Sequence, residues 1–240
     1  YNNEQSRRMR TVESERRYGV QIHHMMALCG GFLGVYAIVN RMGVFASAQT
    51  SNLIELVCDL LGRDPLEISL RVLALGVYVA AMAVFVILEK KTRWNLEYGA
   101  ILVDLAAVAV VGALPETMNS FVALYPVFFA SSFQWCVFKG AKGYVSATVF
   151  STNNLKMTVT AFVEYLISGK EEAGRAKALD KALFYGGTLL YFHVGVAAGY
   201  GAGLLWGTRS AWLCAVPLAL TAGLIAVSGI QAAEEKLMAS

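Results

Sequence analysis

Long apolar runs separated by short polar connections make up most of the 240 residues. Six of these runs are long enough to cross a lipid bilayer, because a full helical span needs about 20 residues. The pattern therefore predicts an all-α membrane protein with six full transmembrane helices. These spans are expected at residues 21–39, 65–88, 98–114, 119–138, 182–205 and 212–230.

Two further apolar stretches, 43–61 and 145–167, are each interrupted by a short polar cluster. The first polar cluster is Thr50-Ser51-Asn52, the second is Thr152-Asn153-Asn154, and a leucine follows each of them. Small and β-branched residues precede each cluster, and apolar residues with helical spacing follow it. Clustered Ser, Thr and Asn favour helix N-termini over helix interiors. We therefore expect two broken or re-entrant elements, in which extended chain turns into a helix at membrane depth.

The order of these elements repeats along the chain. A first membrane repeat covers residues 19–114 and a second covers 115–232, and the two polar clusters match in the pattern Thr-x-Asn-Leu. Chance agreement between apolar segments is the alternative, because the matching stretches are short. The remaining residues form a polar N-terminal segment, 1–18, and a polar C-terminal tail, 233–240.

The positions of the basic residues bear on how the two repeats are related. If both broken elements cross the membrane, the repeats are parallel, and the basic clusters at 90–93 and 139–142 fall outside the cell. If each element leaves by the face that it entered, the second repeat is inverted. Those clusters, the basic stretch 170–181 and the five arginines of residues 1–18 then all become cytoplasmic, as the positive-inside rule prefers. We expect this inverted internal repeat, with a cytoplasmic N-terminus.

Composition supports the membrane class. The chain is 57% hydrophobic and 15% charged, with a mean hydropathy of +0.53, whereas a soluble domain carries about 25% charged residues. Its basic residues lie between apolar runs, which argues against a nucleic-acid partner and for the lipid bilayer. The four cysteines are scattered singly and show neither zinc spacing nor a disulfide framework. We expect no metal and no cofactor.

The inverted arrangement would bring two half-helix N-termini toward the bilayer midplane from opposite faces. Free N–H groups and the positive end of a helix dipole attract anions and electron-rich polar groups. Broken helices that meet at a central site are a recurrent transporter design. The alternative is that the polar clusters only cap helices and join them by hydrogen bonds. We expect a site lined by Thr50, Ser51, Asn52, Thr152, Asn153 and Asn154.

Ionisable side chains inside membrane segments are costly and therefore mark candidate functional positions. Lys156 lies one turn into the second half-helix, where it could pair with an acid or neutralise an anionic solute. Glu55 follows Asn52 at capping-box spacing, so a capping role and a solute-binding or proton-coupling role both stay open. Asp104 and His193 are candidates for ion or proton coupling, with a hydrogen-bonded core histidine as the alternative for His193.

These features predict a small secondary transporter or channel for a small polar solute, and the helix dipoles and Lys156 favour an anion. A homodimer is expected, because 240 residues offer little protein to shield a pathway. No Walker loop, HExxH motif or nucleophile elbow stands out, and we expect no enzyme activity. Two alternatives stay open: a non-transporting scaffold or lipid-interacting protein, and a membrane-embedded enzyme in which Asp104, His193 and Glu55 would converge.

The chain also resembles the YoaK-like family of bacterial multi-pass membrane proteins, whose function is unassigned. The resemblance rests on Gly43-Val44-Phe45 leading into the first polar cluster, and on Gln134 followed by Thr148 and the second cluster. The family usually has glycine where Ser51 and Asn153 stand here, and asparagine at Trp135. The resemblance adds Gln134 to the expected site and implies the bacterial cytoplasmic (inner) membrane, without a known substrate.

Overall fold

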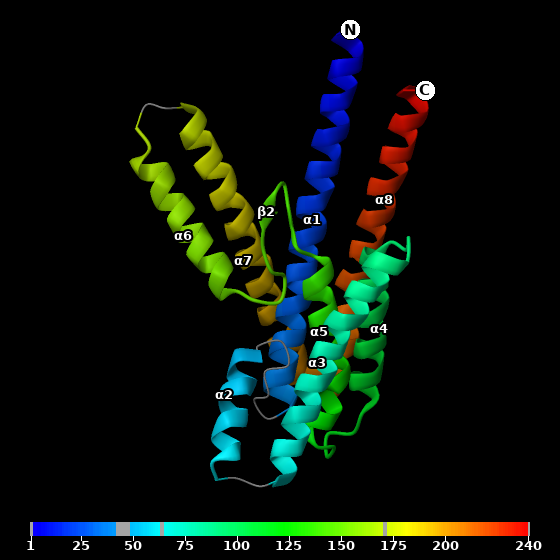
Figure 1. Ribbon diagram of the computed structural model, residues 1–240, viewed down its shortest axis with the longest axis vertical. Coiled ribbons are helices and arrows are strands. Elements are labelled where there is room, and N and C mark those ends of the chain that lie inside the picture. The colour runs from blue at the N-terminus through cyan, green and yellow to red at the C-terminus, as the bar shows by residue number, and fades with distance from the viewer. Residues whose placement is uncertain (1, 42–48, 63–64, 170–171, 240) are drawn as a thin grey trace.

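The computed structural model describes residues 2–41, 49–62, 65–169 and 172–239. Helices aligned along one long axis make up most of it, with a short hairpin in the second half (Figure 1). The helices of the first half and the helix that opens the second are α1 (Asn2–Asn40), α2 (Gln49–Leu60), α3 (Pro65–Lys91), α4 (Leu96–Ala113) and α5 (Ser120–Val137). They are followed by β1 (Gly140–Ala141), β2 (Tyr144–Val145), α6 (Thr152–Ile167), α7 (Glu172–Trp206), the 3-10 helix η1 (Gly207–Cys214) and α8 (Ala215–Ala239).

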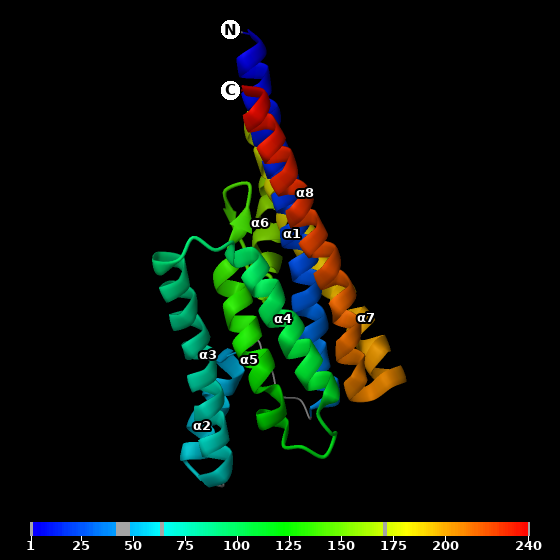
Figure 2. The ribbon, with the colours of Figure 1, turned by 90° about the vertical axis from the view of Figure 1, so that its right-hand side faces the viewer.

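The first helix of each half packs into the other half. α1 lies mainly against α7 and α8, whereas α5 lies against α3 and α4. α4 also contacts η1 and α8, so the two groups of helices share one core (Figure 2). Buried apolar side chains from α1, α3, α4, α5 and α8 form this core. The result is one bundle in which neither half has its own separate interior.

Five helical stretches of the described residues are long and apolar enough to cross a membrane. The fifth stretch, Ala173–Gln231, covers most of α7, all of η1 and most of α8. The chain reverses direction at η1, so that α8 runs back toward the end where both termini lie (Figures 1 and 2). The structure therefore supports the class predicted from the sequence, an all-helical multi-pass membrane protein. The five stretches are Tyr18–Asn40, Pro65–Lys91, Leu96–Ala113, Ser120–Val137 and Ala173–Gln231.

The two polar clusters lie in the first turns of the two shortest α-helices of the described chain, α2 with 12 residues and α6 with 16. At 1.5 Å per residue, α2 is too short to cross a bilayer. Both helices begin near the middle of the long axis and run toward opposite ends of the molecule (Figure 1). The predicted break before the second cluster is confirmed, because residues 146–151 are not helical. The matching segment before the first cluster, 43–48, lies outside the described residues.

Strands β1 and β2 form a two-stranded antiparallel hairpin that the sequence analysis did not predict. Gly140 pairs with Val145 and Ala141 with Tyr144. The two turn residues, Lys142 and Gly143, have φ values of 55° and 82°, which is the type I′ geometry that suits two-residue hairpins. The sequence signal for this hairpin is a residue pair that ends in glycine and lies between two short β-prone stretches.

Two helix boundaries differ from the expected spans. The charged connection expected at 169–181 and the span expected at 182–205 belong to one helix, α7, from Glu172 onward. Residues 207–214, expected to lie partly in a connection, form η1, which begins at Gly207 with a positive φ of 55°. Helical propensity in a Lys, Glu and Ala-rich connection is enough to extend a membrane helix into water.

Candidate functional site

The N-terminus of α6 lacks a side-chain cap. Ser151 occupies the cap position but its side chain makes no capping hydrogen bond. By contrast, the Oδ1 atoms of Asn95 and Asn119 accept backbone N–H groups at the starts of α4 and α5, at 2.9 Å from Glu97 and 3.0 Å from Phe121. The first amide groups of α6 are therefore not satisfied by a capping side chain. Thr152 and Asn153, in this first turn, are both exposed.

Asn154 points back into the protein and shapes the chain that leads into α6. Its Oδ1 accepts a hydrogen bond from the Ser146 hydroxyl at 2.8 Å. Its Nδ2 donates to the carbonyl oxygens of Ala147 and Phe150, at 2.8 and 3.0 Å. Asn154 is 1% exposed. Its hydrogen bonds all go to other residues of the protein, as expected if this cluster residue has a structural role.

Gln134 connects this segment to the centre of the bundle. Its Nε2 donates to the carbonyl oxygen of Met26 on α1 at 3.0 Å and to Oγ1 of Thr148 at 2.9 Å. The Thr148 carbonyl lies so close to Gly30 that a Cβ there would collide with it. The Oε1 atom of Gln134 is buried without a hydrogen-bond partner among the described residues. Gln134 therefore holds α1, α5 and the 146–151 segment together.

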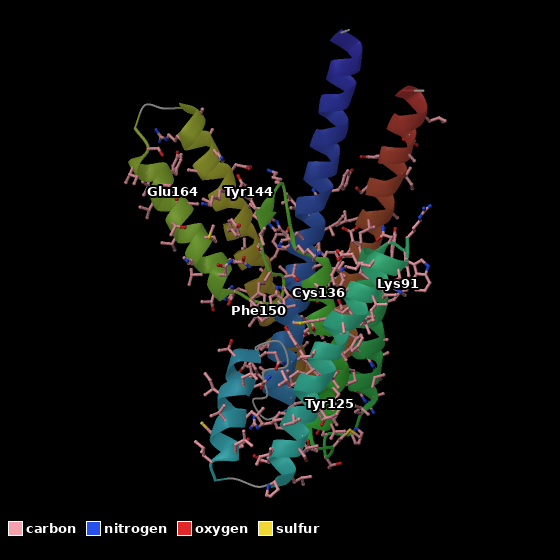
Figure 3. The ribbon with its side chains drawn as sticks, in the orientation of Figure 1. Lys91, Tyr125, Cys136, Tyr144, Phe150 and Glu164 are labelled. Carbon is pink, nitrogen blue, oxygen red and sulfur yellow. The ribbon has the colours of Figure 1, made fainter. Side chains whose placement is uncertain are left out.

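Trp135, which follows Gln134, packs on the 146–151 segment that leads into α6. Its ring meets that of Phe150 edge to face, with centroids 5.0 Å apart. Figure 3 shows Phe150 where the chain turns into α6 and Glu164 toward the other end of that helix. The tryptophan thus gives the turn an apolar support that an asparagine would not provide.

The first polar cluster lies at the start of α2, and the acids that follow it on this helix pair with α3. Asn52 is buried, Ser51 is half-buried and Thr50 is exposed. The Glu55 carboxylate pairs with Nη1 of Arg71 on α3 at 2.5 Å, and Asp59 pairs with Nε of the same arginine at 2.7 Å. The side chain of Asp59 is fully buried. The sequence analysis missed Arg71, which fastens α2 to α3.

The ionisable candidates do not converge on one point. Lys156 is exposed and makes no ion pair with a described residue. Asp104 is fully buried without a hydrogen-bond partner in the described chain, so it does not pair with Lys156. His193 is exposed, and its Nδ1 lies 2.8 Å from the Leu189 carbonyl of its own helix. With Glu55 held by Arg71, the convergence that an enzyme would need among Asp104, His193 and Glu55 is not present.

Comparison with known proteins places the chain in a family. A family model described as a protein of unknown function, DUF1275, matches residues 22–224. The chain belongs to the DUF1275 family. The match confirms the YoaK-like resemblance and covers every expected site residue. No curated protein and no solved structure matches the chain. The family description of this DUF1275 protein names no substrate.

Polar contacts at the hairpin of this DUF1275 protein tie it to α7, and the residue before it contacts the end of α3. Lys139 Nζ pairs with Glu89 at the end of α3, 2.9 Å away, and Lys142 Nζ pairs with Asp180 on α7 at 2.8 Å. The Tyr144 hydroxyl donates to the same Asp180 carboxylate at 3.2 Å. Burial raises the pKa of Tyr144, and the negative charge of Asp180 adds to the shift, so the phenol keeps its proton and stays a donor.

At the opposite end, a cavity of about 530 Å³ lies between the end of α4 and the junction of α7 with η1. Glu116, Thr208 and Arg209 supply its polar groups. Behind it, the buried Arg41 donates to the carbonyl oxygens of Leu114 and Pro115, at 3.2 and 2.9 Å. None of the predicted site residues lines this cavity. Sequence reasoning missed it because its lining comes from two connections far apart in the chain.

Proposed function

We propose that this DUF1275 protein is a small secondary transporter or channel that binds a small polar, preferably anionic, solute at the start of α6. The observation that carries the proposal is the uncapped N-terminus of α6 near the middle of the long axis. Amide groups without a capping side chain, at the positive end of a helix dipole, favour an anion. Lys156 follows one turn later and is exposed, so its charge adds to the attraction.

The halves are proposed to form an inverted repeat of three crossings each. The support is the exchanged packing of α1 and α5, together with the opposite directions of α2 and α6. Each short helix also carries an acid that pairs with a base on the next helix, Asp59 with Arg71 and Glu164 with Lys181. Rocking of one half against the other would expose the solute alternately to the two sides. The N-terminus is proposed to be cytoplasmic, in the bacterial inner membrane.

A homodimer remains part of the proposal. α2 and α6 pack mainly on one neighbour each, α3 and α7, and their other faces hold exposed apolar side chains such as Ile54 and Phe162. A second copy of the chain or lipid would cover these faces. Cross-linking in native membranes would show whether two copies lie together.

The internal bonds of Asn154 favour the rival proposal of a non-transporting scaffold. In that rival, the second polar cluster only fixes the course of the chain between α5 and α6. The exposed Thr152, Asn153 and Lys156 would then have no role in binding, and their substitution would change neither stability nor any ligand response.

The deciding experiment is a flux assay with purified protein in liposomes. Chloride, nitrate, formate and phosphate would be tested as anions, with urea and glycerol as neutral solutes. If one anion moves, Lys156→Gln should lower its flux roughly tenfold, equivalent to about 1.4 kcal/mol of transition-state stabilisation. Lys177→Gln removes the same charge from an exposed position on α7 and should leave the flux unchanged. Transport is refuted if no solute moves and none raises the thermal stability of the protein.

A further inference from the structure

The carboxyl group of Asp104 is enclosed at the midpoint of α4. Asp104 lies nine residues after the Asn95 cap and nine before Ala113, the last residue of the helix, which is about 14 Å from each end at 1.5 Å per residue. The side chain is 0% exposed, and neither oxygen has a hydrogen-bond partner in the described chain. Ile101 and Val108, one turn away on either side, are also buried. The carboxyl group is therefore in the apolar centre of the bundle.

The thiol of Cys29 faces this carboxyl group, and a second thiol, that of Cys214, lies next to the first. Cys29 on α1 interacts electrostatically with Asp104 and shares a hydrogen bond with the thiol of Cys214 on η1. Both cysteines are 0% exposed. Thiols are weak donors, so they compensate little for the water that an ionised carboxylate would lose.

Several other titratable side chains of the surrounding helices contact other parts of the protein. The Tyr36 hydroxyl of α1 donates to the Val111 carbonyl, and the Tyr125 hydroxyl of α5 donates to Leu70 on α3. On α1, the His23 and His24 rings both stack on Phe184 of α7. Cys136 of α5 interacts with Tyr78 of α3. α8 has no titratable residue between 215 and 230.

A carboxylate in these surroundings does not stabilise the closed bundle. An ionised group buried without a partner costs several kcal/mol or more, and in practice takes up a proton instead. An aliphatic residue at position 104 would pack against Ile101 and Val108 without that cost. The closed bundle is consistent with the neutral acid only, and the ionised form requires water or a cation to reach it.

We propose that Asp104 binds and releases a proton, and that its ionisation opens the contact between α1, α4 and η1. Release leaves a carboxylate that water must solvate, and the proton passes to that water. Rebinding of a proton from the other side restores the neutral acid and the closed contact. Because α4 belongs to the first half and η1 to the second, this opening loosens one of the contacts between the halves. The inference rests on the proposed transport function in one respect, since it makes protons the coupling ion.

The buried thiols report the opening directly. Cys58→Ser and Cys136→Ser first remove the exposed and the half-buried thiol, which leaves Cys29 and Cys214. Methyl methanethiosulfonate, a small reagent that adds a methylthio group to a thiolate, is then applied to the liposome-reconstituted protein between pH 5 and pH 9. Mass spectrometry measures the rate at which each cysteine is modified. With Asp104 in place, the rate should rise more steeply than the thiolate fraction alone explains.

Asp104→Asn is the matched control, because asparagine has the shape of the protonated acid and cannot ionise. At pH 9 it should react at least tenfold more slowly than the protein with Asp104, and at pH 5 the two should agree. Equal rates across the whole range would overturn the proposal. If Asp104→Asn does not fold, infrared spectra of the unsubstituted chain and of Asp104→Glu replace it. A protonated-carboxyl C=O band at neutral pH, shifted by the glutamate, supports the proposal, and its absence refutes it.

The liposome flux measurement distinguishes a failure of this inference from a failure of the proposed function. If the thiol experiment succeeds and no tested solute moves, transport fails while the proton-dependent opening stands. If an anion moves but a pH gradient neither drives nor alters its flux, and Asp104→Asn transports at the normal rate, the coupling role fails while transport stands.

Discussion

Gly31 on α1 and Gly195 on α7 each lie against the backbone of the other helix. A Cβ at Gly31 would collide with the carbonyl oxygen of Phe192, and one at Gly195 would collide with that of Leu28. Each contacted carbonyl belongs to the residue three positions before the opposing glycine, so the contact is reciprocal. Such small residues let helix backbones approach closely in membranes.

Gly195→Leu should disrupt the fold. The leucine side chain would have to displace backbone, for which overpacking costs of about 3 kcal/mol or more are expected. Gly201→Leu is the control, because nothing lies within 4 Å of a Cβ at that position on the same helix. Thermal unfolding in detergent measures both. Equal midpoints for the two variants would show that the close contact is absent.

Asn154→Ala should destabilise the protein by about 2 to 4 kcal/mol, because it leaves the Ser146 hydroxyl and two carbonyl oxygens without their partner. Asn153→Ala, at an exposed position next to it, should change stability by less than about 0.5 kcal/mol. Denaturant titration of the two variants decides the matter. Similar values would mean that Asn154 does not fix the 146–151 segment.

Arg71→Met should cost about 3 kcal/mol or more, since it removes a cation that pairs with the buried Asp59. Lys139→Met breaks a pair whose side chains are 59% and 46% exposed, and should cost at most about 1 kcal/mol. Asp59→Asn in the Arg71→Met background should recover part of the loss. Additive effects of the two substitutions in a double-mutant cycle would contradict direct pairing.

Added cysteines just after α2 and just after α6 test the inverted repeat. Gly62→Cys and Gly169→Cys fall at positions with nothing within 4 Å of a Cβ, in a background without Cys58 and Cys136. A membrane-impermeant maleimide should label Gly62→Cys from outside the cell and Gly169→Cys only in inside-out vesicles. Labelling of both from one side would exclude the inverted arrangement.

The sequence predicted the fold where periodicity and local chemistry agree. The apolar runs became helices, and the second polar cluster marks the start of α6 after a non-helical segment. Local patterns could not place Arg71 against Asp59, or Tyr144 against Asp180. The first pair joins α3 to α2 and the second joins β2 to α7, so both depend on how separate elements pack. Within the second polar cluster, Asn154 faces inward and Asn153 outward. This difference depends on the rotation of α6 about its axis and on which neighbour α6 packs against. Lys156 and Asp104 stay predictions for function, since their positions alone reveal no ligand.

The exchanged packing of α1 and α5 also has a consequence for biosynthesis. α1 is synthesised first, yet its main neighbours, α7 and α8, leave the ribosome last. Until then, the Gly31 face of α1 must be covered by lipid, the insertion machinery or a chaperone. Severing the chain between α4 and α5 should therefore yield two fragments that are degraded when made alone but assemble when made together.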